Sequence, residues 1–152
     1  MLRALVVVAA LAMVACGMMA TPPSDEEMTT RFRTDRGAFE SLRETLHASA
    51  ALSNRGSWVM NQSDIDRMSL EPATADALRK AFLELKLEWI RGNGKITFVT
   101  WAADLPGPGH QARGFVWAPS RPEGQPRSPD RASFEEYTPI EGNWYLFAEL
   151  ID

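Results

Sequence analysis

A short run of turn-forming residues, Gly92-Asn93-Gly94, constrains the fold of this chain more than any other feature. Glycine and asparagine tolerate the positive φ angles that a tight β-hairpin turn requires. Residues 95–101, after the turn, are rich in β-branched and aromatic side chains, and apolar and charged residues alternate over 83–89 before it. The pattern predicts two antiparallel strands that meet at this turn.

Further strands are expected because β-forming stretches alternate with turn signals as far as the C-terminus. The turn at Gly92 and the proline-rich segment 119–131 are expected at one end of the sheet. The turns at 106–109 and Gly142 are expected at the other end. The fold class predicted is α+β, an antiparallel meander of about five strands with two helices packed on one face. The expected strands are 86–91, 95–103, 112–118, 133–140 and 143–150, and 58–60 is a further candidate.

The first helix is predicted from one apolar face. Phe39, Leu42 and Leu46 recur at helical spacing, and we expect the helix to begin with Thr34 or Asp35 as its N-cap and to end near residue 50.

The second helix has two possible ends. Pro72 suits a first turn, and helical spacing continues to Arg91. A helix of that length would carry Leu83 and Leu87 on the side opposite its apolar stripe. A helix over 73–85 followed by a strand removes this conflict, and we prefer it.

The N-terminal residues resemble a bacterial export signal that ends at the lone cysteine. Arg3 precedes an uncharged apolar run over 4–13, which is too short to span a bilayer. Residues 13–16 (Met-Val-Ala-Cys) are similar to the lipobox of bacterial lipoproteins, with methionine where leucine is usual. The similarity implies that Cys16 is lipidated and that cleavage occurs before it. Gly17 implies sorting to the outer membrane, since the retention signal of that family is an aspartate.

These features divide the chain into a signal peptide (1–15), a lipidated Cys16 with a flexible tether (16–33) and a single α+β domain (34–152). The tether contains two adjacent prolines and lacks apolar periodicity at its start. An exported chain with no second cysteine has no disulfide, so the lipid anchor best explains its thiol. The alternatives are ordinary cleavage after Ala20, an uncleaved N-terminal anchor and a cytoplasmic chain.

Two segments of the predicted sheet carry a family resemblance. They are 113–117 (Arg-Gly-Phe-Val-Trp) and 137–147 (Tyr-Thr-Pro-Ile-Glu-Gly-Asn-Trp-Tyr-Leu-Phe). Together they resemble a group of small predicted bacterial lipoproteins of unknown function. The match covers a minority of the chain, is most specific over 140–145 and is poor in the proline-rich loop. The resemblance implies export and the order of the strands, and it brings no activity and no catalytic residues.

Composition and motifs disfavour nucleic-acid binding and acyl-transfer catalysis. With 16 Lys and Arg against 20 Asp and Glu, the formal net charge is −4. The sequence has no basic stripe that could bind the phosphates of a nucleic acid. His47 and His110 are expected on a helix surface and in an exposed turn, with no nucleophile beside them. Adjacent residues on a strand point to opposite faces, so Glu135 and Glu136 do not flank one bond.

Metal binding is also disfavoured. Residues 61–66 have a passing likeness to a calcium loop, but the central glycine is missing. We expect a surface turn and helix capping there, and no metal, cofactor or catalytic residue in the chain.

Two features remain as candidate binding elements. The five tryptophans are expected mainly between sheet and helices, where Trp89 and Trp144 fit, although exposed ones would suit sugars or a protein partner. The segment 119–131 is long for a connection between neighbouring strands. Its candidate partner-binding residues are Arg121, Arg127 and Arg131.

These observations favour a cell-envelope lipoprotein, anchored in the outer membrane through Cys16, with a periplasmic domain. We expect this domain to be a non-catalytic module that binds an envelope protein or the cell wall. The alternatives are a cell-wall- or lipid-directed hydrolase that uses carboxylates, and a structural or stress-related spacer. Two convergent carboxylates in a deep pocket would favour the hydrolase, and a uniformly polar surface would favour the spacer.

Overall fold

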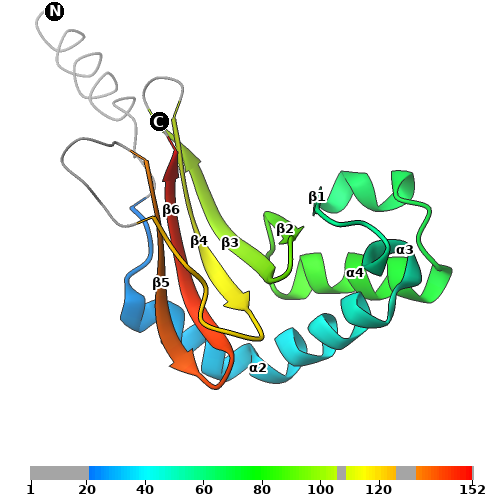
Figure 1. Ribbon diagram of the computed structural model, residues 1–152, viewed down its shortest axis with the longest axis horizontal. Coiled ribbons are helices and arrows are strands. Elements are labelled where there is room, and N and C mark those ends of the chain that lie inside the picture. The colour runs from blue at the N-terminus through cyan, green and yellow to red at the C-terminus, as the bar shows by residue number, and fades with distance from the viewer. Residues whose placement is uncertain (1–20, 106–108, 126–132, 152) are drawn as a thin grey trace, which may run out of the picture.

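The computed structural model describes residues 21–105, 109–125 and 133–151, which form one antiparallel sheet with helices packed against it (Figure 1). The order of strands across the sheet is β1-β2-β3-β4-β6-β5. No helix in these residues is long and apolar enough to cross a membrane. The helices are α2 (Asp25–Ala48), α3 (Ala50–Ser53), the 3-10 helix η1 (Gln62–Arg67) and α4 (Pro72–Glu84). The strands are β1 (Trp58–Met60), β2 (Trp89–Gly92), β3 (Ile96–Asp104), β4 (His110–Trp117), β5 (Phe134–Glu141) and β6 (Trp144–Ile151).

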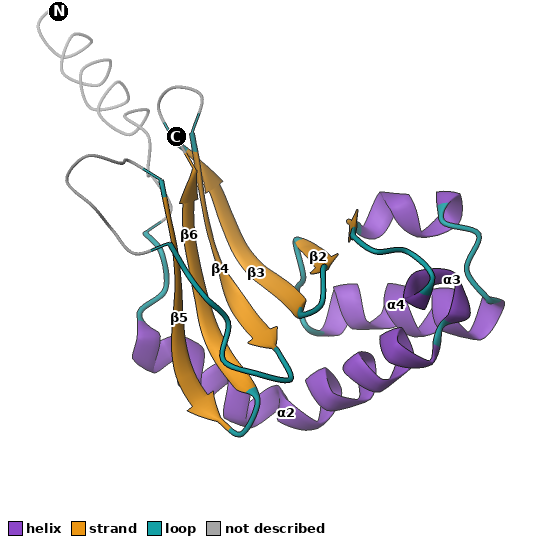
Figure 2. Ribbon diagram, in the orientation of Figure 1, coloured by secondary structure: helices purple, strands orange, loops and turns teal. Residues whose placement is uncertain are grey.

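The predicted α+β class is confirmed, and Figure 2 shows the helices gathered on one side of the sheet. The sheet has six strands because the candidate strand at 58–60 pairs with β2, with Met60 opposite Ile90. Both of these side chains are fully buried in the layer between sheet and helices.

The strand order departs from the predicted meander at the last hairpin. β6 pairs with β4, with Trp144 opposite Trp117, and β5 forms the edge beyond β6. The reason lies in the side chains: Trp144 to Phe147 of β6 are buried, so β6 needs a neighbour on each side. β5 is more exposed and contains Pro139, which suits an edge strand.

This order places the turns differently from the prediction. β4 and β5 start at the same end of the sheet, so the connection between them begins and ends at opposite ends of the sheet. That separation explains why the proline-rich connection is so long. The Gly142 turn lies at the same end as the Gly94 turn, so its predicted position beside 106–109 is wrong.

The start of α2 is fixed by a capping box. The Ser24 hydroxyl accepts a hydrogen bond from the Glu27 N–H (3.2 Å), and the Glu27 carboxylate accepts one from the Ser24 N–H (2.7 Å). These bonds satisfy backbone donors that a helix start leaves free. The acidic residues of the first turn, Asp25 among them, also favour the positive end of the helix dipole.

The predicted helix start at Thr34 or Asp35 is therefore wrong, and residues 25–33 are not a flexible tether. Met28 and Phe32 continue the apolar stripe toward the N-terminus and are almost completely buried. The prediction failed because prolines mark a helix boundary as readily as a tether, and here they end immediately before the N-cap.

The predicted division between second helix and strand is confirmed. α4 ends at Glu84, and β2 begins at Trp89 rather than at Lys86. Lys86 has a φ of 46°, which breaks the helix, and Leu85 and Leu87 beside it are buried. The strand starts late because these two leucines fill the core before pairing with β3 begins.

Aromatic rings occupy the centre of the core between α2 and the sheet. The ring centroid of Phe39 lies 4.9 Å from that of Phe115 and 5.6 Å from that of Phe98. Trp144 is buried in the same layer, as predicted, and its indole N–H donates to Glu40 of α2 (2.8 Å). The centre of the helix side of the sheet is thus a closed, packed layer.

Candidate functional site

The opposite side of the sheet is the main candidate site, because none of the described helices packs against it (Figure 2). A separate small apolar cluster lies on this side and includes Val99, Val116 and Phe147. Charged and aromatic side chains surround this cluster and contact one another. We call this surface the open face, and its interacting residues are Trp89, Arg91, Lys95, His110, Glu135, Tyr137 and Glu149.

Arg91 is at the centre of an ion network on the open face. Its guanidinium lies 3.1 Å from Glu135 Oε1 and 3.4 Å from Glu149 Oε2, two residues directly opposite each other on β5 and β6. The Glu149 side chain is only 5% exposed, so Arg91 compensates a carboxylate that is removed from water. The guanidinium also lies over the rings of Trp89 and Phe147, 5.5 Å from each centroid.

Lys95 and Tyr137 extend this network along the sheet, toward the end where the turns at Gly94 and Gly142 lie. The Tyr137 hydroxyl donates to Glu135 and accepts from Lys95 Nζ, which lies 4.2 Å from the centroid of the tyrosine ring. Burial raises the pKa of Tyr137, and the hydrogen bond to Glu135 and its charge act in the same direction. Tyr137 is therefore held as a neutral hydrogen-bond donor.

We expect Tyr137 to keep its proton where a tyrosine in an unfolded chain ionises, at about pH 10. In an absorbance titration, the rise of the tyrosinate signal near that pH should be the same in the folded wild type and in Tyr137→Phe. A smaller rise in the variant would contradict the assignment. Because the unfolded chain loses this proton first, the free energy of unfolding should also fall above about pH 10, less steeply in Tyr137→Phe.

A cleft of about 590 Å³ opens on the open face beside Arg91. It is bounded by Val59 of β1, Trp89 of β2 and Ala102 of β3, with Glu149 also in its lining. Its volume is in the range of pockets that hold small ligands or a few side chains, roughly 300–1,000 Å³. Apolar, aromatic and charged groups therefore meet in one accessible hollow.

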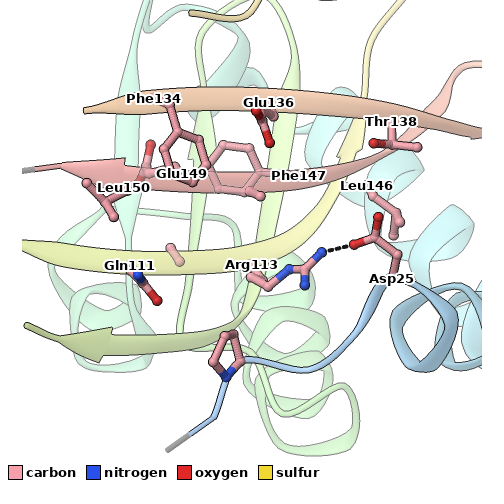
Figure 3. A pocket seen from close by; sticks show the side chains of 13 residues that line it. Asp25, Gln111, Arg113, Phe134, Glu136, Thr138, Leu146, Phe147, Glu149 and Leu150 are labelled. Atoms are coloured by element: carbon pink, nitrogen blue, oxygen red, sulfur yellow. Dashed lines mark hydrogen bonds and ion pairs between the residues drawn. The ribbon is translucent and has the colours of Figure 1, made fainter. Parts of the chain in front are cut away.

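A second cavity, about 420 Å³, lies on the helix side where the chain enters the domain (Figure 3). Arg113 of β4 donates hydrogen bonds to the Pro23 carbonyl and to the Asp25 carboxylate. Figure 3 shows Asp25 and Arg113 facing each other across this cavity, with Glu136 above them on β5. Since its polar contacts tie the start of α2 to the sheet, we assign it a structural role.

The residues singled out from the sequence are placed only in part. Cys16, Arg127 and Arg131 lie outside the described residues, as does the signal peptide. Arg121 is exposed. The loop that carries it follows the edge of β5, where the Gln125 carbonyl accepts a hydrogen bond from the Glu135 N–H (2.8 Å). The assignment of Arg121, Arg127 and Arg131 to partner binding stays a prediction.

Three individual predictions can be compared directly with the structure. His47 lies exposed on α2 against Trp117, as expected for a helix-surface histidine. His110 is not in an exposed turn: it begins β4, and its Nε2 lies 3.3 Å from Glu149 Oε1. Trp89 is also misplaced by the prediction, because it is half-buried on the open face rather than packed under the helices.

The predicted capping at residues 61–66 is confirmed. Asn61 caps η1 through the Ser63 N–H (2.8 Å), and the Asp64 carboxylate accepts from the Asn61 N–H (3.0 Å). In the described part of the chain, no group of three or more His, Cys, Asp or Glu side chains could hold a metal ion.

Arg91 and Glu149 are the site residues that sequence reasoning missed. The predicted opposition of Glu135 and Glu136 is correct for their side chains, since Glu135 joins the open face and Glu136 lines the second cavity. What brings Glu135 to Glu149 is the register of β5 on β6. The one sequence signal was a charged residue, Glu149, among the apolar residues of the last strand.

Comparisons with protein-family models, with curated proteins and with solved structures find no match to this chain. The resemblance to small bacterial lipoproteins therefore stays a prediction.

Proposed function

We propose that this protein is a lipid-anchored envelope protein whose domain is a non-catalytic binding module, with the open face as its binding surface. The observation that carries the proposal is the open face itself. Natural sheets with one face packed on helices can leave the other face to water and polar residues. Here that face instead combines a fixed ion network, a half-buried tryptophan and a cleft of about 590 Å³.

Exposed apolar residues support binding at the cleft. Val59 and Ile151 line it and are 59% and 43% exposed. Large apolar side chains beside an aromatic and a buried charge pair are typical of surfaces that become covered by a partner.

The position of α2 supports close attachment to a membrane, if Cys16 carries the lipid. Only residues 17–24 separate Cys16 from the start of α2 at Asp25. Fully extended residues span at most about 3.5 Å each, which limits this connection to roughly 30 Å. Because Arg113 also fixes Pro23 and Asp25 to the sheet, the domain is held near the bilayer rather than on a long tether.

The proposed lipid anchor is tested by substituting the cysteine. In cells that supply labelled fatty acid, we expect Cys16→Ser to incorporate none and to leave the precursor unprocessed or released from the membrane. A serine variant that is labelled like the wild type would contradict lipidation at Cys16.

The binding surface is tested by variants at exposed positions that leave the core unchanged. Val59→Lys with Ile151→Lys alters the open face, whereas Leu83→Lys is the matched control, since Leu83 is 67% exposed on α4. After crosslinking in intact cells, we expect one partner that is captured by the wild type and by the control and is lost from the double variant. A partner lost equally from both, or from neither, would contradict binding at this face.

A carboxylate-dependent hydrolase is the second candidate, because Glu135 and Glu149 face each other across two strands. Both carboxylates contact Arg91, and Glu149 also faces His110. These contacts occupy the oxygens that a hydrolase would direct at its substrate. We therefore rank binding first. Turnover of wall fragments that is abolished by Glu149→Gln would reverse this ranking.

A further inference from the structure

We propose that the free edge of β3, residues 100–104, binds an extended basic peptide segment of a partner protein, which adds to the sheet as a further strand. This inference rests on the proposed function and goes further by naming the partner chemistry and the mode of recognition.

The sheet is incomplete along this edge. β3 pairs with β2 only through residues 96–99, with the last pair formed by Val99 and Trp89. β3 continues to Asp104 and pairs there with β4 alone. No other strand of the described residues lies beside 100–104, and Figure 1 shows β3 extending well past the end of β2.

The backbone of this edge has groups directed away from β4. The Leu105 N–H donates to the Gly109 carbonyl (2.8 Å), which closes the β3–β4 hairpin. Hydrogen-bonded and non-bonded pairs alternate along an antiparallel ladder. The N–H and C=O groups of Ala102 and Asp104 are therefore directed outward, where a strand beyond β3 would pair with them.

Side chains at this edge leave room for such a strand. Ala102 and Ala103 are small, and both line the cleft of about 590 Å³ beside the edge. Val59 of β1 and Trp89 of β2 also line this cleft. A peptide paired with β3 would thus occupy the cleft with every second side chain.

The charge of the cleft indicates a basic occupant. Glu88, Asp104 and Glu149 line it, whereas its one arginine, Arg91, already contacts two carboxylates. Glu88 and Asp104 have no ion-pair partner among the described residues, and Asp104 is exposed. A lysine or arginine of the peptide would find these carboxylates, with the face of Trp89 beside them.

The opposite edge of the sheet shows the contrast. β5 is partly covered by the chain's own loop, which forms a bridge between Gln125 and Glu135. Proteins protect exposed strand edges in this way against unwanted pairing. The edge of β3 has no such cover among the described residues, which suits a strand that receives a partner.

The test uses fluorescently labelled synthetic peptides and the full-length protein purified in detergent. One peptide alternates lysine and valine, a second alternates glutamate and valine, and a third has the lysine–valine sequence with methylated backbone nitrogens. We expect only the first to bind, with the other two weaker by at least about tenfold, because one has the wrong charge and the other lacks backbone donors. Equal binding of the methylated peptide would overturn strand addition, and equal binding of the acidic peptide would overturn the basic partner.

Variants of the protein locate the binding edge. Ala102→Pro removes the outward N–H, so we expect it to lower the affinity for the lysine–valine peptide by at least about tenfold. Ala102→Val keeps this N–H, so we expect that variant to bind the peptide. Should Ala102→Pro fail to fold by circular dichroism, Asp104→Lys with Glu88→Lys replaces it, and unchanged binding by that variant would overturn the proposal. Dimerisation of the wild type that Ala102→Pro abolishes would show that a second copy occupies the edge, which also overturns it.

The two proposals fail separately. If the Val59 and Ile151 variants lose a cellular partner but no peptide binds at Ala102, the binding module is supported and strand addition is rejected. If no such cellular partner is found, the proposal that the open face binds a partner is itself rejected.

Discussion

Replacement of Arg91 by methionine is expected to lower the free energy of unfolding by about 3 kcal/mol in urea denaturation. Methionine retains an apolar stem over Trp89 and Phe147 but leaves Glu149, 5% exposed, without its cation. Removing one partner of a buried ion pair costs about 3–5 kcal/mol, and the lower end applies because His110 still faces Glu149.

The matched control is Arg79→Met on the protein surface. Arg79 also contacts two carboxylates, at 2.5 Å from Asp66 and 2.7 Å from Asp76, but all three side chains are largely exposed. We expect a much smaller loss there than at Arg91, because water and salt screen exposed ion pairs. Adding Glu149→Gln to Arg91→Met should restore at least about 1 kcal/mol, because the uncompensated charge is removed. Additive losses in the double variant, or equal losses at Arg91 and Arg79, would show that the network does not hold a buried charge.

Phe32→Ala is expected to cost about 3–5 kcal/mol, the range for removal of a fully buried phenylalanine. The ring is 0% exposed and packs against Phe115 and Trp144, with centroids 5.4 Å and 5.1 Å away. The comparison is Leu83→Ala, which should change stability by about 0.5 kcal/mol or less, since Leu83 is 67% exposed. If residues 16–33 formed a flexible tether, Phe32→Ala would unfold at the same urea concentration as the wild type.

Local pattern was sufficient to predict most of the sheet. The Gly92-Asn93-Gly94 turn and the β-forming residues after it predict β3 to within a residue at each end, and the last two strands follow the same logic. Alternation and turn residues act over a few positions, so they are visible in one sequence. The helix α4 and its separation from β2 were predicted for the same reason.

Long-range pairing was not visible in the same way. The position of β6 between β4 and β5 depends on how many apolar side chains each strand buries, a property of the assembled sheet. The start of α2 was missed because its capping residue follows two prolines, which also suit a tether. A serine followed three residues later by glutamate, Ser24 and Glu27, was the signal that could have located it.

The candidate site belongs to this second class of features. Arg91, Glu135 and Glu149 come from three strands: the register of β5 on β6 pairs the two glutamates. Arg91 lies on β2, with β3 and β4 between it and β6, and contacts both glutamates across the open face. No spacing in the sequence marks such a cluster, whereas each residue alone is an ordinary charge on a strand. A single charged residue among the apolar residues of a buried strand, such as Glu149, indicates a polar network.

The most direct test of the binding surface is photocrosslinking in living cells from single positions of the full-length protein. A photoreactive amino acid at Ala102, exposed beside the cleft, is compared with the same residue at Leu83, exposed on α4 away from the open face. We predict one discrete crosslinked partner from Ala102 and none from Leu83. Identical products from both positions, or none from Ala102, would contradict a binding module that uses the open face.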